Sequence, residues 1–280
     1  MLAWQIGDVR ITQIVELTTA SLGPYLLPQA TPEQMEAIDW ISPFVDAQQR
    51  IVLSIHALVL ETRDQCIVVD TCIGNDKERT YPRWNHMQGR FLDDFVARGF
   101  SLNRVDTVLC THMHVDHVGW NTRLVDGRWE PTFANARYLF AEREWRHWSR
   151  EPQEYGPVIE DSVQPIFDRG LADLVGETHR VTDEIRLEPT PGHTPGHVSV
   201  HITSRGEEAV ITGDMIHHPC QIAHPGWSSS ADVDPFAAAS TRERFLARYS
   251  DRPVLIIGTH FAAPTAGRIV RDGAAYRLDY

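Results

Sequence analysis

Apolar residues recur along this chain with two different periods, and each period predicts a different kind of element. Short runs that are apolar throughout, or at every second position, are typical of β-strands. They predict strands over residues 9–17, 52–61, 66–70, 106–111, 138–140, 185–187, 198–202, 209–212 and 254–258. Residues 198–202 and 209–212 flank the turn sequence Ser204-Arg-Gly206, so we expect these two strands to pair as a hairpin.

Apolar residues spaced three and four positions apart predict amphipathic helices between these strands. Such patterns cover residues 91–99, 141–150, 162–174 and 235–249. The first helix is expected to stop at Gly99, and in the second Trp145 and Trp148 are expected to be packing residues. Strands and helices that follow one another without a linker predict a single mixed α/β (α+β) domain over residues 1–280.

Two segments lie outside these patterns, and the sequence leaves their role open. Residues 20–43 are rich in proline and apolar side chains, and residues 75–88 contain Tyr81, Trp84 and Met87. Long loops often cover a binding site, but they also pack against the core or against a partner chain. Either segment could therefore form an apolar wall of a substrate pocket or serve packing alone.

The stretch Thr-His112-Met-His114-Val-Asp116-His117 carries the strongest chemical pattern of the chain and predicts a metal site. Three imidazoles and a carboxylate fall within six residues, directly after a mostly apolar run. Neutral imidazole is the commonest protein metal ligand, and carboxylate is the usual oxygen ligand for zinc or iron. His112 and His114 are two residues apart, so a helix would point them about 200° apart, whereas a strand end lets both face one ion. Asp116 and His117 are expected at the start of a helix.

Three later strand ends supply further residues of the ligand type. The turn Pro-Gly-His193-Thr-Pro-Gly-His197 follows one predicted strand, Asp214 ends a second, and His260 ends a third. Taken singly, an aspartate at a strand end is more often a turn or cap residue, and a lone histidine is usually only hydrogen-bonded. Their shared position at strand ends, downstream of a metal-binding cluster, favours metal ligation.

The ordered set His-x-His-x-Asp-His, Pro-Gly-His-Thr-Pro-Gly-His, Thr-Gly-Asp and Gly-Thr-His resembles the metallo-β-lactamase-fold hydrolase superfamily, from about residue 58 to residue 260. The resemblance implies a four-layered αββα sandwich with two divalent metal ions at one edge, expected to be zinc, with iron, manganese or cobalt as alternatives. It implies that His112, His114 and His193 hold one ion, that Asp116, His117 and His260 hold the other, and that Asp214 bridges them. Asp70 matches a family position that orients the ligands by hydrogen bonding, which a metal-bound imidazole requires.

The composition is that of an ordinary globular enzyme, which we expect to be cytoplasmic. The formal net charge is −12, with 38 acidic and 26 basic residues, and Lys77 is the only lysine. Such a surface repels polyanions, which argues against nucleic acid as a partner. The sequence contains neither a membrane-spanning apolar run nor a secretory-signal pattern, so we expect no membrane partner. The four cysteines, Cys66, Cys72, Cys110 and Cys220, have no CxxC spacing and are expected to be reduced core thiols.

The chemistry expected of this site is metal-assisted hydrolysis. Two cations that share a water lower its pKa, so that a bridging hydroxide attacks a carbonyl or phosphoryl centre while a metal stabilises the oxyanion. Asp116 is expected to take the proton of the attacking water and to pass it to the leaving group.

The resemblance narrows the substrate by elimination. Asp214 stands where zinc β-lactamases commonly have Cys or Ser, and the segment after His260 is shorter than the glutathione-binding domain of glyoxalase II. No long insertion of the nuclease kind separates the ligand segments. The chain is therefore similar to quorum-quenching lactonases that open acyl-homoserine lactones, and to arylesterase-like hydrolases. These lactonases often have Tyr three residues after the bridging Asp, where this chain has His217, which we expect to hydrogen-bond the substrate. His218 and His224 are expected on the surface.

We therefore expect an enzyme that opens lactones or cleaves esters of small, partly apolar molecules. The alternative is hydrolysis of a phosphotriester, phosphoester, thioester or β-lactam at the same dinuclear site. A third hypothesis, an iron protein with redox or oxygen-handling activity, lacks an electron-carrier domain to support it. The expected partner is a small-molecule substrate, and analogy with the family suggests a homodimer.

Overall fold

The computed structural model describes residues 2–280, which divide into two compact units. The first unit comprises residues 3–16 and 55–176, and the second comprises Leu2 and residues 17–54 and 177–280. Each unit has its own large β-sheet with helices beside it. The mixed α/β class with several sheets is thus confirmed, whereas the single-domain organisation and the αββα layering stay predictions.

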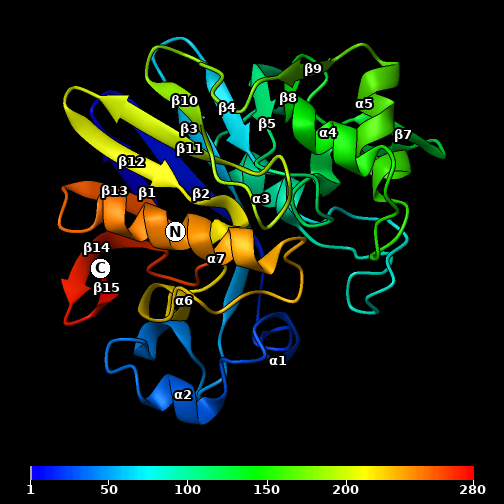
Figure 1. Ribbon diagram of the computed structural model, residues 1–280. Coiled ribbons are helices and arrows are strands. Elements are labelled where there is room, and N and C mark those ends of the chain that lie inside the picture. The colour runs from blue at the N-terminus through cyan, green and yellow to red at the C-terminus, as the bar shows by residue number, and fades with distance from the viewer. Residues whose placement is uncertain (1) are drawn as a thin grey trace. The chain divides into compact units, whose positions relative to one another are not determined.

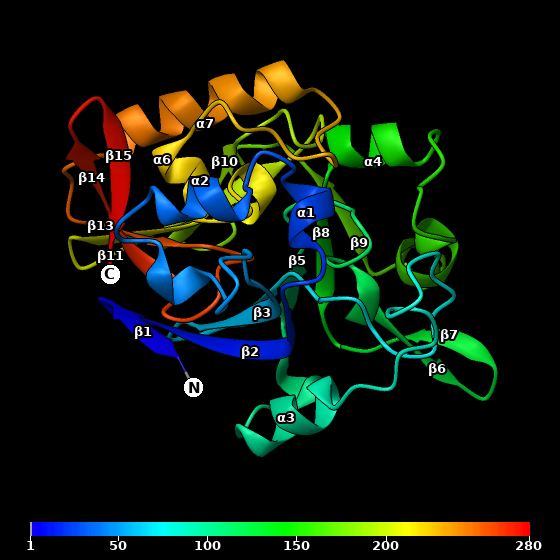
Figure 2. The same ribbon diagram turned by 90° about the horizontal axis from the view of Figure 1, so that it is seen from below.

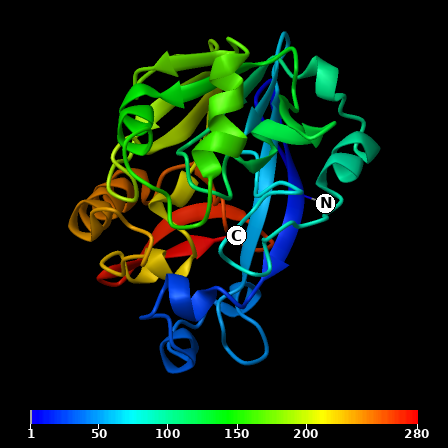
Figure 3. The same cartoon turned by 90° about the vertical axis from the view of Figure 1, so that its right-hand side faces the viewer.

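The sheet of the first unit has the strand order β1-β2-β3-β4-β5-β8-β9. Its strands are β1 (Ala3–Ile6), β2 (Val9–Thr19), β3 (Leu53–Glu61), β4 (Cys66–Val69), β5 (Thr107–Leu109), β8 (Arg137–Ala141) and β9 (Ala172–Val175). The two longest, β2 and β3, run side by side (Figure 3). From β4 to β9 all neighbours are parallel, so their carboxyl ends meet at one edge of the sheet, where ligands commonly bind.

Short helices and a separate two-stranded ribbon complete the first unit. They are α3 (Phe91–Ala97), η2 (Leu102–Arg104), η3 (Gly119–Asn121), β6 (Thr122–Val125), β7 (Arg128–Pro131), α4 (Glu142–Trp148), the π-helical turn η4 (Ile159–Val163) and α5 (Gln164–Asp168). Figure 2 shows α3 and the β6–β7 ribbon as projecting elements of this unit. Phe167 of α5 stacks on Phe140 of β8 and on Trp145 of α4, which confirms Trp145 as a packing residue.

Two expected helices of the first unit are wrong in part. The helix expected over residues 162–174 ends at Asp168, because Gly170 takes a positive φ of 68° and residues 172–175 then pair with β8 as β9. No α-helix starts at Asp116 and His117, which lie in a turn before the single-turn η3. The backbone there bonds to a neighbouring loop instead, since Gly119 N–H donates to Cys72 O and Trp120 N–H donates to Thr71 O.

The second unit is built on a six-stranded sheet with the order β10-β11-β12-β13-β14-β15. Its strands are β10 (Ile185–Pro189), β11 (Val198–Ser204), β12 (Glu207–Ile211), β13 (Val254–Ile257), β14 (Ala266–Asp272) and β15 (Ala275–Asp279). The hairpin β11–β12 is confirmed. Only β12 and β13 are parallel, because the chain between them makes a helical crossover.

Helices of the second unit cover its sheet and include most of the segment 20–43. They are α1 (Gly23–Leu26), α2 (Pro32–Glu36), η1 (Ser42–Phe44), η5 (Gly213–Met215), α6 (Cys220–Ala223) and α7 (Pro235–Tyr249). The long helix α7 is capped by Asp234, whose side chain accepts a hydrogen bond from Ala237 N–H, and it lies along one face of the sheet (Figure 1). The buried apolar residues of segment 20–43 join the core formed by the strands and α7: Leu27, Ala30, Met35, Ile38 and Ile41. Much of this segment therefore serves packing.

The segment 75–88 is likewise anchored in its own unit. Lys77 and Arg79 are buried, and Arg79 makes a two-pronged ion pair with Asp161 of η4 at 2.6 and 3.0 Å. Lys77 Nζ donates to Thr122 Oγ1 at 2.8 Å and lies 3.8 Å from the centre of the Trp129 ring. This half of the segment packs against the unit rather than forming an open loop.

Three of the four cysteines match the expectation of reduced core thiols, whereas Cys66 is only half-buried. All four cysteines are free, and Cys72, Cys110 and Cys220 are buried. Across residues 2–280, every helix falls short of the length and apolar character that crossing a membrane requires.

Candidate metal centre

The ligand candidates of the first unit lie on two loops that leave its sheet at the same edge. β4 and β5 are parallel, with Val69 opposite Leu109, so the residues that follow these strands emerge together. Asp70 comes directly after β4 and has a positive φ of 56°, which turns the chain sharply at the strand end. The histidine-rich stretch follows β5 two residues later.

The carboxylate of Asp70 ties three groups of the histidine-rich stretch together. It accepts hydrogen bonds from Thr111 N–H at 2.8 Å, from the Thr111 hydroxyl at 2.9 Å and from His117 Nδ1–H at 2.9 Å. Because the Thr111 hydroxyl gives its hydrogen to Asp70, its oxygen accepts Nδ1–H of His112 at 3.1 Å. Both imidazoles are thereby held in the tautomer whose Nε2 lone pair is available to a metal.

The side chains of this stretch converge on one another. The ring centre of His112 lies 4.0 Å from that of His117 and 4.7 Å from that of His114. Asp116 Oδ1 lies 3.7 Å from His117 Nε2. His112 and His117 are buried, whereas His114 and Asp116 are half-buried. Three imidazoles and a carboxylate so close together form a donor set that suits a divalent cation.

Two acidic side chains from other elements hold these loops. Glu144 on α4 accepts Met113 N–H at 3.1 Å and Trp148 Nε1–H at 2.6 Å, and the Trp148 ring stands edge-on to His114 at 5.2 Å. Glu16 on β2 accepts N–H groups of Ile73, Gly74 and Trp120 at 2.8, 3.2 and 2.6 Å. Burial raises the pKa of the Glu16 carboxyl to about 7, against the effect of these three donors.

In the second unit, Asp214 and His260 meet because β12 and β13 are parallel. Ile211 is opposite Ile257, and each of the two ligand candidates comes three residues later. His260 Nε2 therefore lies 3.1 Å from Asp214 Oδ1. Nδ1–H of His260 donates to Ser54 O at 3.1 Å, so a lone pair on Nε2 faces the carboxylate. A nitrogen lone pair and a carboxylate repel each other unless a proton or a cation lies beside them.

His193 reaches the same carboxylate from the turn between β10 and β11. Its Nε2 lies 3.5 Å from Asp214 Oδ2, and its Nδ1–H donates to Asp232 Oδ1 at 2.9 Å. The turn is seated on α7, where a side chain at Gly192 would come within 2.2 Å of the Ala238 nitrogen. His193 is thus fixed both by its backbone and by its Nδ1 partner.

Asp232 is in turn held by a buried cation of α7. Its Oδ2 accepts Ser229 N–H at 2.8 Å and lies 4.0 Å from Nη2 of Arg242. Burial raises the pKa of Asp232, an effect that the nearby Arg242 opposes. Arg242 is fully buried and donates to the carbonyl oxygens of Met215, Pro225 and Trp227 at 2.9, 2.6 and 2.7 Å.

Four other histidines of the second unit lie in different environments. Both ring nitrogens of His197 are engaged within the protein, since Nε2 accepts Asp214 N–H and Nδ1–H donates to Thr190 Oγ1, each at 2.8 Å. His217 is buried, with Nε2 3.3 Å from Asp214 Oδ2. The expected surface position of His218 is wrong: it packs fully buried against Phe44, and burial lowers its pKa to about 4. His224 is half-buried and stacks on Trp227.

The structure thus groups the predicted residues by unit. The first unit brings together His112, His114, Asp116, His117 and Asp70, and the second brings together His193, Asp214, His217 and His260. Sequence reasoning missed Thr111, Glu144, Asp232 and Arg242, which orient these groups. Only Thr111 could have been found from the sequence, because it adjoins the histidine-rich stretch. Asp232 could not be told from Asp234, whose side chain caps α7.

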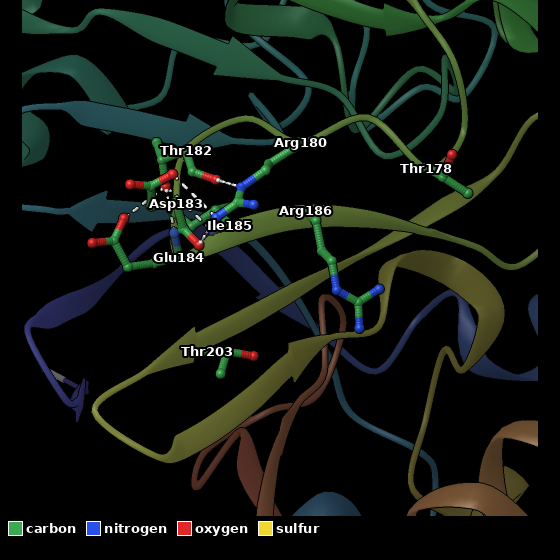
Figure 4. A pocket seen from close by; sticks show the side chains of 8 residues that line it. All are labelled: Thr178, Arg180, Thr182, Asp183, Glu184, Ile185, Arg186 and Thr203. Atoms are coloured by element: carbon green, nitrogen blue, oxygen red, sulfur yellow. Dashed lines mark hydrogen bonds and ion pairs between the residues drawn. The ribbon is translucent and has the colours of Figure 1, made fainter.

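A hollow of about 410 Å³ also lies in the second unit, at the start of β10 (Figure 4). It is lined by Thr178, Arg180, Thr182, Asp183, Glu184, Ile185, Arg186 and Thr203. Arg180 turns back onto its own loop and donates to the carbonyl oxygens of Thr182 and Asp183. The lining includes none of the metal-ligand candidates, so we assign this hollow no part in the chemistry.

Comparison with known proteins agrees with the donor set. The curated relatives include "Probable metallo-hydrolase YybB" of Bacillus subtilis (strain 168), 24% identical over 173 residues, which are 62% of this chain and 67% of that protein. They also include "Probable metallo-hydrolase Mb2322c" of Mycobacterium bovis (strain ATCC BAA-935 / AF2122/97), 27% identical over 182 residues, which are 60% and 58% of the two chains. The chain therefore spans about two thirds of the first relative and less of the second.

A solved structure and a family model extend this likeness. The fold is shared with AidC, a dizinc quorum-quenching lactonase solved with the product N-hexanoyl-L-homoserine, at a TM-score of 0.80 and 19% identity over 99% of this chain and 96% of that one. The family model described as the metallo-beta-lactamase superfamily matches residues 50–260, which contain every metal-ligand candidate described above. The chain belongs to the metallo-beta-lactamase superfamily.

Proposed function

We propose that this metallo-hydrolase opens lactones or cleaves esters of small, partly apolar molecules with the help of two divalent ions. In this proposal, His112, His114 and His193 hold one ion, Asp116, His117 and His260 hold the other, and Asp214 lies between them. Membership of the superfamily and the ligand motifs support this arrangement.

The observation that carries the proposal is the set of lone pairs directed at Asp214. Nε2 of His260 and Nε2 of His193 lie 3.1 and 3.5 Å from its two oxygens, while the Nδ1–H groups of both rings are already donated to Ser54 O and Asp232. Lone pairs held this close to a carboxylate need a positive charge among them. Zinc bonds to such donors at about 2.0–2.2 Å, so these residues fit a divalent ion.

The residues of the chain would divide the work as follows. When bound, the ions polarise the scissile carbonyl group and lower the pKa of the attacking water. Asp70 and Asp232 keep Nδ1 of His117 and His193 protonated and thereby direct each Nε2 inward. The half-buried carboxylate of Asp116 takes the proton of the attacking water and returns it to the leaving group. His217, beside Asp214, contacts the substrate.

Two features favour lactones and carboxylic esters as the substrate class. The leaving group of these substrates is an alkoxide, which needs the proton that Asp116 can return. The chain also shares its fold with AidC, described as a lactonase, and carries aspartate at the bridging position. We propose a small-molecule substrate, without a nucleic-acid or membrane partner, since the acidic surface disfavours polyanions.

The test is a substrate panel on full-length protein whose metal content has been measured. The panel contains acyl-homoserine lactones, simple lactones, aryl acetates and a paraoxon-type triester. We expect metal-dependent turnover of lactones and aryl esters. His112→Ala and Asp214→Asn should lose metal and at least about 100-fold in kcat/KM, while circular dichroism stays that of the wild type. His224→Ala is the matched control and should keep both metal and activity.

Two outcomes would change the assignment. If fully metallated protein leaves every lactone and aryl ester intact, the proposed substrate class is wrong. If the triester is hydrolysed much faster than the carboxylic esters, the reaction is at phosphorus instead.

A further inference from the structure

His217 lies beside the carboxylate of Asp214, and the superfamily motifs leave it without a metal role. We infer that Nε2 of His217 is an additional, exchangeable ligand of the ion held by His193 and Asp214. This inference rests on the proposed function insofar as it requires that metal to bind, and it adds a protein ligand from within the second unit.

The spacing of the donor atoms supports ligation. Nε2 of His217 and Nε2 of His193 lie 3.3 and 3.5 Å from the same oxygen, Oδ2 of Asp214. The three donor atoms all lie within 4.8 Å of one another. Ligand atoms that bind one ion at about 2.0–2.1 Å lie roughly 3 Å from one another. The carboxylate oxygen therefore has two imidazole nitrogens at the separations that ligands of one ion show.

The contact between His217 and Asp214 is not an ordinary hydrogen bond. Neither ring nitrogen of His217 has a hydrogen-bond partner, although only 1% of the residue is exposed. A buried polar group without a partner is destabilising, and such a group in a native protein usually has an ion, a water or a ligand as its partner. A metal ion bound beside Asp214 would give Nε2 of His217 the partner that it lacks among residues 2–280.

The ring of His217 differs from the rings of His193 and His260 in the environment of Nδ1. Nδ1 of His193 is held by Asp232, and Nδ1 of His260 is held by Ser54 O. Nδ1 of His217 is held by nothing among residues 2–280. Outer partners of this kind fix the ring and strengthen a metal ligand by about 10- to 100-fold in affinity. His217 therefore binds the ion more weakly than His193 and can rotate away from it.

This difference reconciles ligation with the proposed contact to substrate. A ring that coordinates through Nε2 cannot use the same lone pair elsewhere, so the two roles must alternate. In the resting protein His217 occupies a coordination position, and it leaves that position when a substrate oxygen replaces it. His217 thus occupies the coordination position of the substrate oxygen until substrate binds.

Cobalt(II) is the probe for this inference, because a thiolate bound to cobalt gives a near-ultraviolet charge-transfer band that imidazole lacks. Full-length wild type, His217→Cys and His224→Cys are loaded with Co(II), and their absorption spectra are compared. We expect the thiolate band only in His217→Cys. The natural cysteines serve as internal background, since the wild type contains all four of them. His224→Cys controls for a new cysteine elsewhere in the same unit.

The second measurement is Co(II) affinity by competition with a chelator. We expect His217→Ala to weaken binding roughly tenfold and His193→Ala to weaken it roughly 100-fold or more. If His217→Cys binds Co(II) without a thiolate band, or if His217→Ala binds as tightly as the wild type, the inference is wrong and the proposed function stands. If the wild type itself binds no Co(II), both the metal centre and this inference are overturned.

Discussion

The two units bring their metal-ligand candidates together in different ways. In the first unit, His112, His114, Asp116 and His117 belong to one loop, and the carboxylate of Asp70 accepts three hydrogen bonds from it. In the second unit the ligand candidates come from three separate strand ends and meet around Asp214. One group is local in sequence, and the other exists only once the sheet has formed.

Because of this difference, the two groups of ligand candidates depend on different parts of the fold. The loop of the first unit needs the register of β4 and β5, which is set by adjacent parallel strands. The group in the second unit needs the parallel pairing of β12 with β13, and hence the crossover through α7. Arg242 of that helix also binds three carbonyl oxygens of the crossover and stands beside Asp232. The second group should therefore be more sensitive to changes in a helix remote from the ligands in sequence.

Replacement of Arg242 is the strongest test of this comparison. In Arg242→Met, three carbonyl oxygens lose their donor and buried Asp232 loses its nearby cation. Removing one member of a buried ionic network typically costs about 3–5 kcal/mol. We expect the midpoint of urea unfolding to fall accordingly and the metal content to drop. Both are measured on purified protein, by circular dichroism and by elemental analysis.

Arg248→Met provides the matched control on the same helix. Arg248 pairs with Glu188 at 2.9 Å, but its side chain is 53% exposed, so its removal should cost less than about 1 kcal/mol. Equal effects of the two substitutions would show that α7 does not support the second group in the way we describe.

Asp70→Asn tests the carboxylate that accepts three hydrogen bonds from the histidine-rich loop of the first unit. The amide can still accept Thr111 N–H, but it cannot accept from both the Thr111 hydroxyl and His117 Nδ1–H as the carboxylate does. We expect metal affinity to fall about 10- to 100-fold and stability to fall by about 1–3 kcal/mol. Metal titration and urea unfolding measure the two losses. Exposed Asp64 is the control position, where Asn should change neither quantity.

Asp232→Asn is the corresponding change in the second unit and should have a smaller effect. Asp232 orients one imidazole, His193, whereas Asp70 orients His117 directly and His112 through Thr111. We expect a loss of metal affinity near tenfold, by the same titration. A loss larger than that of Asp70→Asn would reverse the ranking of the two carboxylates.

The same contrast explains what the sequence could and could not predict. The histidine-rich stretch could be predicted because its ligand candidates are neighbours in the chain. The strands that carry Asp214 and His260 could be predicted from their apolar runs. Asp232 was missed because it lies in a loop that no periodic pattern describes, and its partner His193 is 39 residues away. The helix expected at Asp116 does not form for a related reason, since the backbone of residues 117–120 bonds to Thr71 and Cys72, which local propensity does not include.

Lys77 offers a smaller test that acts on the first unit alone. Its amine is fully buried, and burial lowers its pKa to about 7, partly offset by the attraction of Asp161. Between about pH 7 and 10.5 the unfolded chain therefore binds a proton that the folded chain does not. Stability then rises with pH across this window, by at most about 1.4 kcal/mol per pH unit, because the cost of burying the charge disappears.

Lys77→Met should remove this rise, so the wild type should gain stability relative to the variant between about pH 7 and pH 9.5. Urea unfolding of both proteins at the two pH values measures the difference, and other groups that titrate there cancel. Because Lys77 is the only lysine, the nuclear magnetic resonance signal of its side chain reports its pKa without assignment. A lysine signal that titrates near its ordinary value, about 10.4, would mean that the ion pair with Asp161 outweighs burial. Lys77 would then stay charged in the folded protein, as Arg242 does in the second unit, and stability would not rise with pH across this window.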